Sequence, residues 1–545
     1  MKHFTACLSI VSAALFFSMP SAEGADSPVR VLKHPQTGRP VRYSALPQDF
    51  RRVMLPVKYH VRPGEFRGVW IATYANMDFP RTASAAEFRS RYDSMLRKIK
   101  AAGFNAVFFQ IRPASDAFYP SSIHPFSRFI QGKEGTGCRQ FDMLSYMIQE
   151  AHRHGLQFHA WLNPYRVAGI TRLSREQYLR GLSPQNFARK NPDAVLSVPA
   201  VGGRTLLLNP GVPKVREHLL ATVREIIQKY TPDSIHFDDY FYPYNFFGDE
   251  DLQTYRKYNK NPRVSIEEWR RQNVSLLVKE ISMLIRGNNR VRRKNIRFGI
   301  SPFGIYRNKA STPDGSGSDT NGLQNYDDLY ADVIKWVRSG WIDYCMPQVY
   351  WEIGHKLADY TTLVHWWDRN AYDRHLYIGQ NVKRTMDMKE LQEKMEMTRG
   401  LKHISGNCFW PANEILRNTG GIADQLRTNY HRYPSLIPAY TRMNQEPPAE
   451  IRNLTLKKTQ VGYVLEWSAA MNQHNPNDAE YFVIYRVPEG APLDITDPRN
   501  IVGTTRDTSF EIIYRNGTRS YMYGVTAVNR YHNESLIKQW RKVRI

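Results

Sequence analysis

The chain has 545 residues, 42% of them hydrophobic, which is enough for one large domain with a deep core and a second, smaller domain. A formal net charge of +24 and a pI near 9.7 predict a surface that attracts polyanions. The basic residues are spread along the chain, apart from short groups such as RVRRK at 290–294, without a helix-turn-helix or RNA-binding signature. We therefore expect no nucleic-acid partner. The charge favours an anionic envelope polymer or membrane surface, and a merely solvated basic surface stays open.

Residues 1–25 carry one early lysine, a short apolar run and then small residues, a pattern typical of a secretory signal peptide. The run is too short for a permanent membrane span, and no later stretch reaches the roughly 20 apolar residues that a span needs. We expect no transmembrane segment and an exported protein, in the periplasm or cell envelope or fully secreted. Residues 26–63 are proline-rich and without periodicity, and we expect them to form an N-terminal arm packed on the next domain.

Eight short apolar runs follow between residues 64 and 445, separated by polar or helix-like stretches. They are FRGVWIATY (66–74), NAVFFQIRP (105–113), LQFHAWLNPYR (156–166), SIHFDDYFYP (234–243), IRFGISPFGIY (296–306), DYCMPQVYW (343–351), HLYIGQNV (375–382) and GNCFWPANE (406–414). Eight repeated strand-then-helix units predict an α/β fold, a (β/α)8 TIM barrel over residues 64–445.

Residues 446–545 begin with the linker EPPAEI and are strand-like throughout. Their number and their strand patterns, with Trp467 as a core aromatic, resemble a fibronectin type III domain and predict a C-terminal β-sandwich. Such modules are often spacers or docking surfaces, so an envelope protein partner could bind here.

Metal and cofactor chemistry is not indicated by the sequence. Beyond the leader, Cys138, Cys345 and Cys408 match no zinc spacing, and three cysteines cannot all pair. GTGC lacks the lysine and hydroxyl residue of a phosphate-binding loop. We expect no metal site and no cofactor.

The active site of a TIM barrel lies at the carboxyl ends of its strands, so the residues that end each run are the candidate site. Amides, carboxylates and flat aromatic rings gather there, and this mixture suits a polysaccharide. Each single residue could instead cap a helix or pack at the rim. The candidate substrate-binding residues are Asn76, Asp78, Arg112, Asp116, Asn163, Tyr165, Tyr240, Tyr242, Gln348, Tyr350, Trp351, Trp410 and Glu414.

The fourth run places two carboxylates side by side, Asp238 and Asp239. Alternation along a strand predicts that Ile235 and Phe237 face the helices, while His236 and Asp238 face the barrel interior. Two carboxylates this close repel each other when both are ionised, which raises one pKa and keeps a proton available near neutral pH. Asp239 could protonate the leaving oxygen while Asp238 orients a 2-acetamido group of the substrate, which predicts an N-acetylhexosamine glycan.

Three alternatives to this pairing stay open. Asp239 could be the acid and a distant carboxylate, Glu352 or Asp78, the nucleophile or base. The doublet could cap a helix or loop, held by arginines. His236 with the two aspartates could bind a metal, although no second histidine stands at ligand spacing.

Six blocks, EFRGVWIATYANMDFP, QIRPASDAFYPS, AWLNPYR, HFDDYFYP, ISPFGIYRN and MPQVYW, together resemble the family-10 glycosyl-hydrolase-like proteins of bacterial envelopes over residues 64–415. The resemblance implies a glycoside hydrolase that cuts glycan strands of peptidoglycan, including strands stripped of stem peptides. A non-catalytic protein that binds glycan in the same groove is the alternative.

Two further resemblances concern the acid itself. Family-18 chitinases have a glutamate where this chain has Tyr240, which moves the acid role to Asp239. The adjacent aspartates are similar to those of family-84 N-acetylglucosaminidases, where the first orients the acetamide and the second is the acid. Tyr350 would then be a second contact to the acetamide.

Overall fold

A computed structural model describes residues 28–34, 37–43, 51–137, 140–244, 248–440, 442–472, 475–513 and 517–545. The predicted signal peptide, residues 1–25, lies outside the described residues.

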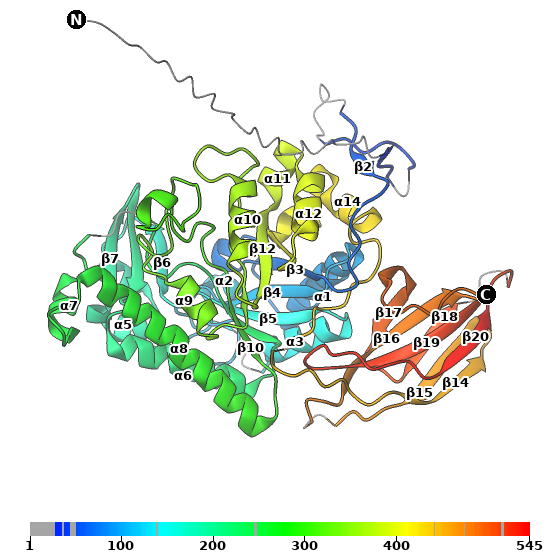
Figure 1. Cartoon of the computed structure of the whole chain (residues 1–545). Helices are drawn as coiled ribbons and strands as arrows, with labels where there is room; N and C mark the ends of the chain where they lie inside the picture. Colours follow the sequence, from blue (N-terminus) through cyan, green and yellow to red (C-terminus); the bar gives the residue numbers. More distant parts are fainter. Residues whose placement is uncertain are drawn as a thin grey trace, which may run out of the picture.

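The described chain contains a closed barrel of eight parallel strands, which confirms the predicted TIM barrel (Figure 1). Seven of the strands fall within the predicted runs, and the eighth, β13, begins two residues before its run at Ile404. β13 closes the barrel by pairing with the first strand, β3. The barrel strands are β3 (Phe66–Ile71), β4 (Ala106–Arg112), β5 (Gln157–Leu162), β9 (Ser234–Phe237), β10 (Arg297–Ile300), β11 (Tyr344–Cys345), β12 (His375–Asn381) and β13 (Ile404–Trp410). We call the carboxyl ends of these strands the barrel top and the amino ends the barrel base.

The strands read as near-continuous apolar runs because both of their faces are buried. Large aromatic residues such as Trp70, Phe108 and Tyr344 fill the interior, whereas Val69 and Phe109 pack outward against the helices. The interior is therefore a packed core, and ligands can reach the barrel only at its ends.

Helices surround the barrel. Helix α1 (Ala85–Ala101) begins at Ser84, whose side chain accepts a hydrogen bond from the backbone of Glu87, and it buries an apolar stripe from Phe88 to Ile99. The other helices of eight or more residues are α3 (Met143–Arg153), α6 (Pro213–Lys229), α8 (Ile266–Arg292), α10 (Tyr360–Arg369) and α12 (Leu391–Gly400). The shorter ones are α2 (Arg128–Gln131), α4 (Arg175–Gly181), α5 (Phe187–Lys190), α7 (Leu252–Tyr258), α9 (Val333–Arg338), α11 (Val382–Met388), α13 (Ala412–Leu416) and α14 (Ile422–Thr428).

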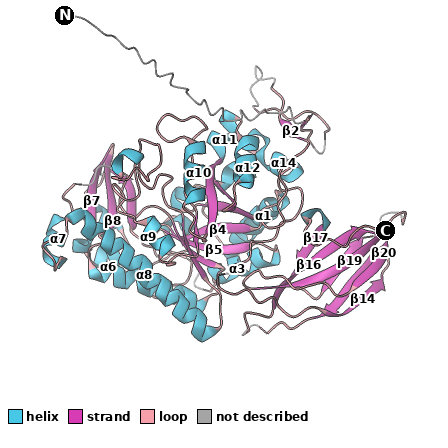
Figure 2. Cartoon of the chain, in the orientation of Figure 1, coloured by secondary structure: helices cyan, strands magenta, loops and turns pink. Residues whose placement is uncertain are grey.

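A three-stranded antiparallel sheet, which the sequence analysis did not predict, is inserted between β5 and β9. It consists of β6 (Arg166–Thr171), β7 (Val195–Ala200) and β8 (Gly203–Leu208) in the order β6-β8-β7. Figure 2 shows β7 and β8 at the opposite side of the molecule from the C-terminal strands. The insertion starts directly where β5 ends, so it brings its first residue, Arg166, to the barrel top.

The N-terminal arm contains a short strand pair, β1 (Val29–Val31) with β2 (Met54–Pro56), around a small core of Leu32, Val53 and Leu55. Its Arg62 donates hydrogen bonds to backbone carbonyls near the end of α12, which ties the arm to the barrel.

The C-terminal region forms two antiparallel sheets, as predicted for a β-sandwich. One has the order β14-β15-β18 and the other β17-β16-β19-β20, and both contribute to one core that includes Trp467. Its likeness to a fibronectin type III domain stays a prediction. The strands are β14 (Arg452–Lys458), β15 (Gly462–Ser468), β16 (Ala479–Pro488), β17 (Ile501–Thr505), β18 (Ser509–Ile513), β19 (Ser520–Asn529) and β20 (Trp540–Arg544).

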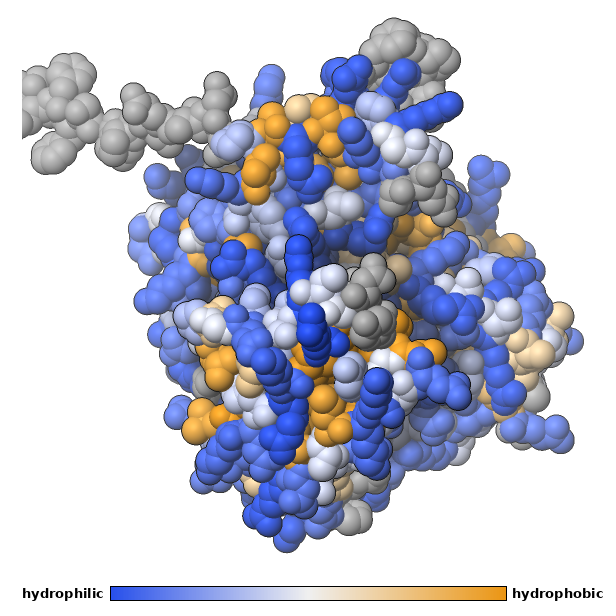
Figure 3. All heavy atoms as spheres, turned by 90° about the vertical axis from the view of Figure 1, so that its right-hand side faces the viewer, coloured by the Kyte–Doolittle hydropathy of each residue, from blue (hydrophilic) through white to orange (hydrophobic). Residues whose placement is uncertain are grey.

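The sandwich packs on the barrel base. Asn295, just before β10, donates to the carbonyl of Arg530, and the Tyr440 backbone donates to that of Tyr531. The face that carries the sandwich is largely hydrophilic, with apolar groups scattered between long hydrophilic side chains (Figure 3). Within the part of the chain described, no helix is both long and apolar enough to cross a membrane.

Candidate active site

Asp238 and Asp239 follow β9 at the barrel top. As predicted, Ile235 and Phe237 pack outward with the helices, and His236 lies inside the barrel. Both aspartates are largely buried, with 6% and 4% of their surfaces exposed. The strand thus ends by placing two adjacent carboxyl groups where the barrel interior meets the top.

Asp238 is held by hydrogen bonds and by one cation. Its Oδ2 accepts from the Asn163 amide, its Oδ1 from the backbone of Tyr240 at 3.4 Å, and an Arg166 guanidinium nitrogen lies 3.9 Å from Oδ2. Burial raises the pKa of Asp238, and the Arg166 charge opposes that shift. Arg166 is itself fixed between the rings of Tyr74 and Tyr240, 4.9 Å from each ring centre.

Gln110 on β4 determines that the nitrogen of the Asn163 amide, and not its oxygen, faces Asp238. Gln110 Oε1 accepts from the backbone nitrogens of Thr73, at 2.9 Å, and Tyr74, at 2.8 Å. Its Nε2 must therefore be the donor to Asn163 Oδ1, which leaves the Asn163 nitrogen to donate to Asp238. A chain of three hydrogen bonds thus runs from β3 to the carboxylate.

Asp239 is the carboxyl that retains a proton. Burial and then the charge of Asp238 raise its pKa to about 7, although hydrogen bonds from Tyr244 and Gln348 act in the opposite direction. Because Arg166 lies beside Asp238, the ionised form is favoured there and the proton at Asp239. A carboxylic acid with a pKa near 7 can donate a proton at neutral pH.

Partly exposed aromatic residues surround the doublet. Burial and then the charge of Asp239 raise the pKa of the half-buried Tyr350. Trp410 stands edge-on to Trp161 at 5.9 Å, and Trp351 edge-on to Phe303 at 5.3 Å. These rings offer flat apolar faces of the kind that sugar rings contact.

The alternative carboxylates have other contacts. Glu352 lies 3.6 Å from Arg384 and 4.0 Å from His355. With Trp410 and Glu414 it lines a hollow of about 600 Å³ whose lining does not include Asp238 or Asp239. Asp78 accepts from the backbone nitrogens of Ala72 and Asn413, which joins the end of β3 to α13, and burial raises its pKa to about 6.

Several predicted binding residues are used inside the protein. Arg112 is fully buried and donates to the carbonyls of Asn163 and Pro164, so it supports the segment that carries Asn163. Tyr165 and Tyr242 are also buried, within the layer between barrel and helices.

Two further predicted residues, Asn76 and Asp116, bind backbone. Asn76 donates to the carbonyls of Phe79 and Phe129, and Asp116 accepts from Ala114. These contacts stabilise the loops after β3 and β4.

The contacts of His236 do not support a metal site at the aspartate doublet. Its Nδ1 contacts the Tyr344 hydroxyl and its Nε2 the Ser301 hydroxyl, so both ring nitrogens have partners inside the barrel. The one cluster with metal-ligand spacing among the described residues is Asp93, Glu150 and His154, on or next to α1 and α3. Cys345 and Cys408 are buried free thiols.

Three residues of the site were not among the predicted ones: Gln110, Arg166 and Tyr244. Gln110 lies near the carboxyl end of β4 and Arg166 is the last residue of the predicted run 156–166, and these positions were the signal that could have identified them. Tyr244 lies seven residues beyond the end of β9 in the chain, and only the folded loop brings its hydroxyl to Asp239.

Known proteins are similar to this chain over most of its length. A family model described as glycosyl hydrolase-like 10 matches residues 65–396. Glycosyl hydrolase YngK of Bacillus subtilis is 35% identical over 489 residues, 86% of this chain and 92% of the relative. Glycosyl hydrolase DigH of Escherichia coli O6:H1 is 35% identical over 374 residues, 63% of this chain and 82% of the relative. The catalytic domain of a β-amylase from Paenibacillus polymyxa matches 68% of this chain and 99% of its own, with a TM-score of 0.42 and 13% identity.

The barrel, with a carboxylate pair at its top, has the architecture of a glycoside hydrolase. The chain belongs to the glycosyl hydrolase-like 10 family.

Proposed function

We propose that this protein is an exported glycoside hydrolase that cleaves an N-acetylhexosamine glycan, namely the glycan strands of peptidoglycan, including strands stripped of stem peptides. The observation that carries the proposal is the unequal surroundings of two adjacent buried carboxyl groups at the barrel top. Asp238 has Asn163 and Arg166 beside it, whereas Asp239 has a pKa of about 7.

The two groups lie on the same side of a bound sugar because they are neighbours on one strand end. In the first step, the acetamide carbonyl oxygen of the substrate forms a bond to C1 while the bond from C1 to the glycosidic oxygen breaks and Asp239 gives that oxygen its proton. Asp238 accepts a hydrogen bond from the acetamide N–H. In the second step, water attacks C1, Asp239 takes the proton, and the acetamide is released.

Three observations support the substrate and location. Two relatives of this chain, YngK and DigH, are named glycosyl hydrolases. The leader-like N-terminus indicates export, and the net charge of +24 favours association with an anionic envelope. Peptidoglycan strands consist of N-acetylated hexosamines, which supply the acetamide that the mechanism needs.

The test is to incubate wild type and Asp239→Asn with intact peptidoglycan and with amidase-treated glycan strands, and to identify released fragments by mass spectrometry. Asp249→Asn, an exposed aspartate in the following loop, is the matched control. We expect fragments from the wild type and the control only. Binding of glycan without fragments from any variant would instead identify a glycan-binding protein.

A further inference from the structure

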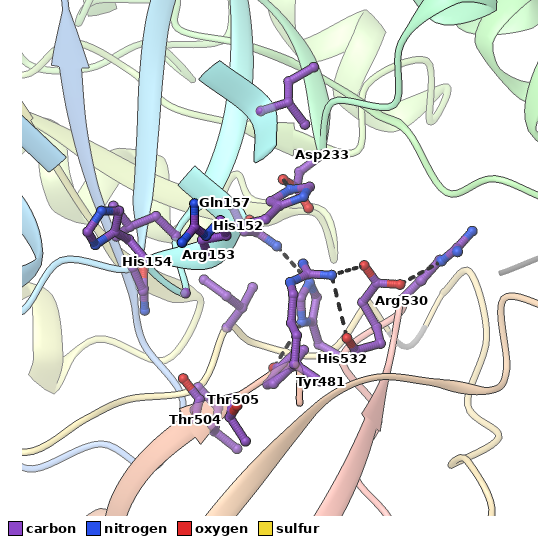
Figure 4. A pocket seen from close by; sticks show the side chains of 18 of the residues that line it. His152, Arg153, His154, Gln157, Asp233, Tyr481, Thr504, Thr505, Arg530 and His532 are labelled. Carbon is purple, nitrogen blue, oxygen red and sulfur yellow. Dashed lines mark hydrogen bonds and ion pairs between the residues drawn. The ribbon is translucent and has the colours of Figure 1, made fainter. Parts of the chain in front are cut away.

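A second site lies at the other end of the barrel from Asp238 and Asp239. A pocket of about 1810 Å³ separates the barrel base from the C-terminal sandwich. Residues at the amino ends of barrel strands, such as Gln157 and Arg297, form one wall, and Tyr481, Thr504 and Arg530 of the sandwich form the other. Figure 4 shows labelled side chains from both domains around this space.

The lining of the pocket is strongly cationic. Three lysines and eight arginines line it, against four aspartates and glutamates. The basic segment 290–294, which the active site does not use, contributes Arg292, Arg293 and Lys294 to this lining. Lys294 lies close enough to other cations that burial, Arg292 and Arg530 together lower its pKa.

Several of these cations are not neutralised by carboxylates. Arg292 donates to the carbonyl of Gln228 at 3.0 Å, Lys294 to that of Tyr230 at 3.2 Å, and Lys100 to that of Gly155 at 3.2 Å. Within the described part of the chain, no carboxylate lies within 4.0 Å of these three or of Arg293.

On the sandwich side, Glu480 faces two guanidiniums. It accepts from both Arg506 and Arg530. On the barrel side, Arg297 is 1% exposed; Asp233 lies 3.8 Å from its guanidinium, and its Nε has no hydrogen-bond partner among the described residues. An anion in the pocket would offset this excess of positive charge.

The size and the other lining groups indicate the kind of anion. The volume exceeds the about 300–1,000 Å³ of a small-molecule site, so a segment of polymer fits better than a metabolite. Thr504, Thr505 and Asn475 supply hydroxyl and amide groups that can bind sugar hydroxyls. Phe104, Tyr230 and Tyr481, the aromatic residues among the described lining, are buried or half-buried, and bases of single-stranded nucleic acid would need exposed rings for stacking.

We propose that this pocket binds a strand of an acidic polysaccharide, with the basic segment 290–294 and Arg530 as its main anion contacts. The strand bridges the barrel and the sandwich and holds the protein on the polymer while the barrel top stays free. Binding at this pocket is an addition to the proposed function and does not depend on hydrolysis at the barrel top. An experiment can therefore contradict one proposal without contradicting the other.

The test uses the full-length protein carrying Asp239→Asn, with polygalacturonate as the probe and calorimetry as the measurement. The pocket variant is Arg292→Gln, Arg293→Asn and Lys294→Gln, with Asn at 293 because that residue has φ +51°. The matched control is Arg256→Gln, Lys257→Gln and Lys260→Gln, three exposed cations on and just after α7, at the opposite edge of the molecule (Figure 1).

We expect the pocket variant to bind polygalacturonate at least tenfold more weakly than the parent, and the control less than threefold. Equal losses in both triple variants would overturn the proposal, because general charge attraction would then explain binding. No binding by the parent would overturn it as well, and so would single-stranded DNA or anionic vesicles binding at the pocket as tightly as the polysaccharide.

Discussion

The guanidinium of Arg297, at the start of β10, donates a hydrogen bond to Nε2 of His532 in the sandwich over 3.0 Å. The Gln157 amide contacts the same nitrogen at 2.7 Å, and the Tyr481 hydroxyl lies 3.3 Å from Nδ1. Because arginine only donates, Nε2 is the acceptor and the imidazole is neutral. Burial and then Arg297 hold the pKa of His532 well below its usual range.

This contact predicts acid sensitivity of the folded protein. The unfolded state takes up a proton at His532 near pH ~6.5, while the folded state does not. The contribution of His532 to the free energy of unfolding is therefore present above pH ~6.5 and is lost as the pH falls below that value. Asp233, His375 and Arg506 also face His532. We expect His532→Gln to lose less stability than the wild type between pH 7.5 and pH 5 in chemical denaturation. Identical slopes of unfolding free energy against pH for the two proteins would show that His532 does not cause the acid sensitivity.

The pKa of about 7 at Asp239 predicts the pH profile of hydrolysis. As general acid it must be protonated, so kcat/KM should fall as the pH rises above about 7. Tyr244→Phe removes a hydrogen bond that lowers this pKa, so the basic limb should move to higher pH. Tyr372→Phe is the control, because Tyr372 is 41% exposed against 44% for Tyr244. A basic limb that stays in place in Tyr244→Phe would argue against Asp239 as the acid.

Gln110 is a positioning residue because it acts on Asp238 through Asn163. In Gln110→Glu the carboxylate can still accept from Thr73 and Tyr74 but cannot donate to Asn163. Losing one buried hydrogen bond costs about 1–3 kcal/mol, and we expect kcat to fall about tenfold to hundredfold with little change in KM.

The control for this variant is Gln380→Glu. Gln380 is buried and donates to Asn407 on the neighbouring strand, a comparable amide pair. Both variants should lose some thermal stability, but only Gln110→Glu should lose kcat. Equal kcat losses would show that Gln110 has a structural role alone.

Glu65 neutralises two buried arginines at the barrel base. It accepts from Arg67 at 2.7 Å and from Arg399 at 2.6 Å, with all three side chains at most 4% exposed. Although burial acts to raise it, the Arg399 and Arg67 charges hold the pKa of Glu65 well below its usual range. The contribution of Glu65 to stability is therefore present above pH ~4.5 and is lost as the pH falls below that value.

Glu65→Gln should destabilise the protein by about 3–5 kcal/mol in urea unfolding, because it leaves buried guanidiniums without their counter-charge. Glu87→Gln, which breaks an exposed pair with Arg91, should leave the unfolding free energy unchanged within error. Similar unfolding midpoints for the two variants would contradict the stabilising role of the buried Glu65 carboxylate.

The barrel could be predicted from the sequence because strands buried on both faces read as continuous apolar runs. The sheet of β6, β7 and β8 was missed because its burial is mixed, with exposed residues such as Ile170 and Val201 in or beside its strands. Nothing in such a pattern separates an inserted sheet from a loop.

The position of the aspartate doublet was predictable, but the contacts around it were not. The pairing of β4 with β5 shifts between Gln110 and Arg112, so Arg112 supports backbone carbonyls while Gln110 acts on Asn163. A register shift of this kind has no signature in the residue types. The direction of the Asn163 amide depends on three strands at once.

The sandwich covers the barrel base and carries the chain end at Ile545, which lies at the edge of the sandwich in Figure 1. A fluorophore, a bead or a fused reporter joined after Ile545 would lie on the sandwich, at the base side of the barrel. The doublet at the opposite end would keep its access to an insoluble glycan sheet. Immobilised or tagged forms of this protein should thus be prepared through the carboxyl terminus.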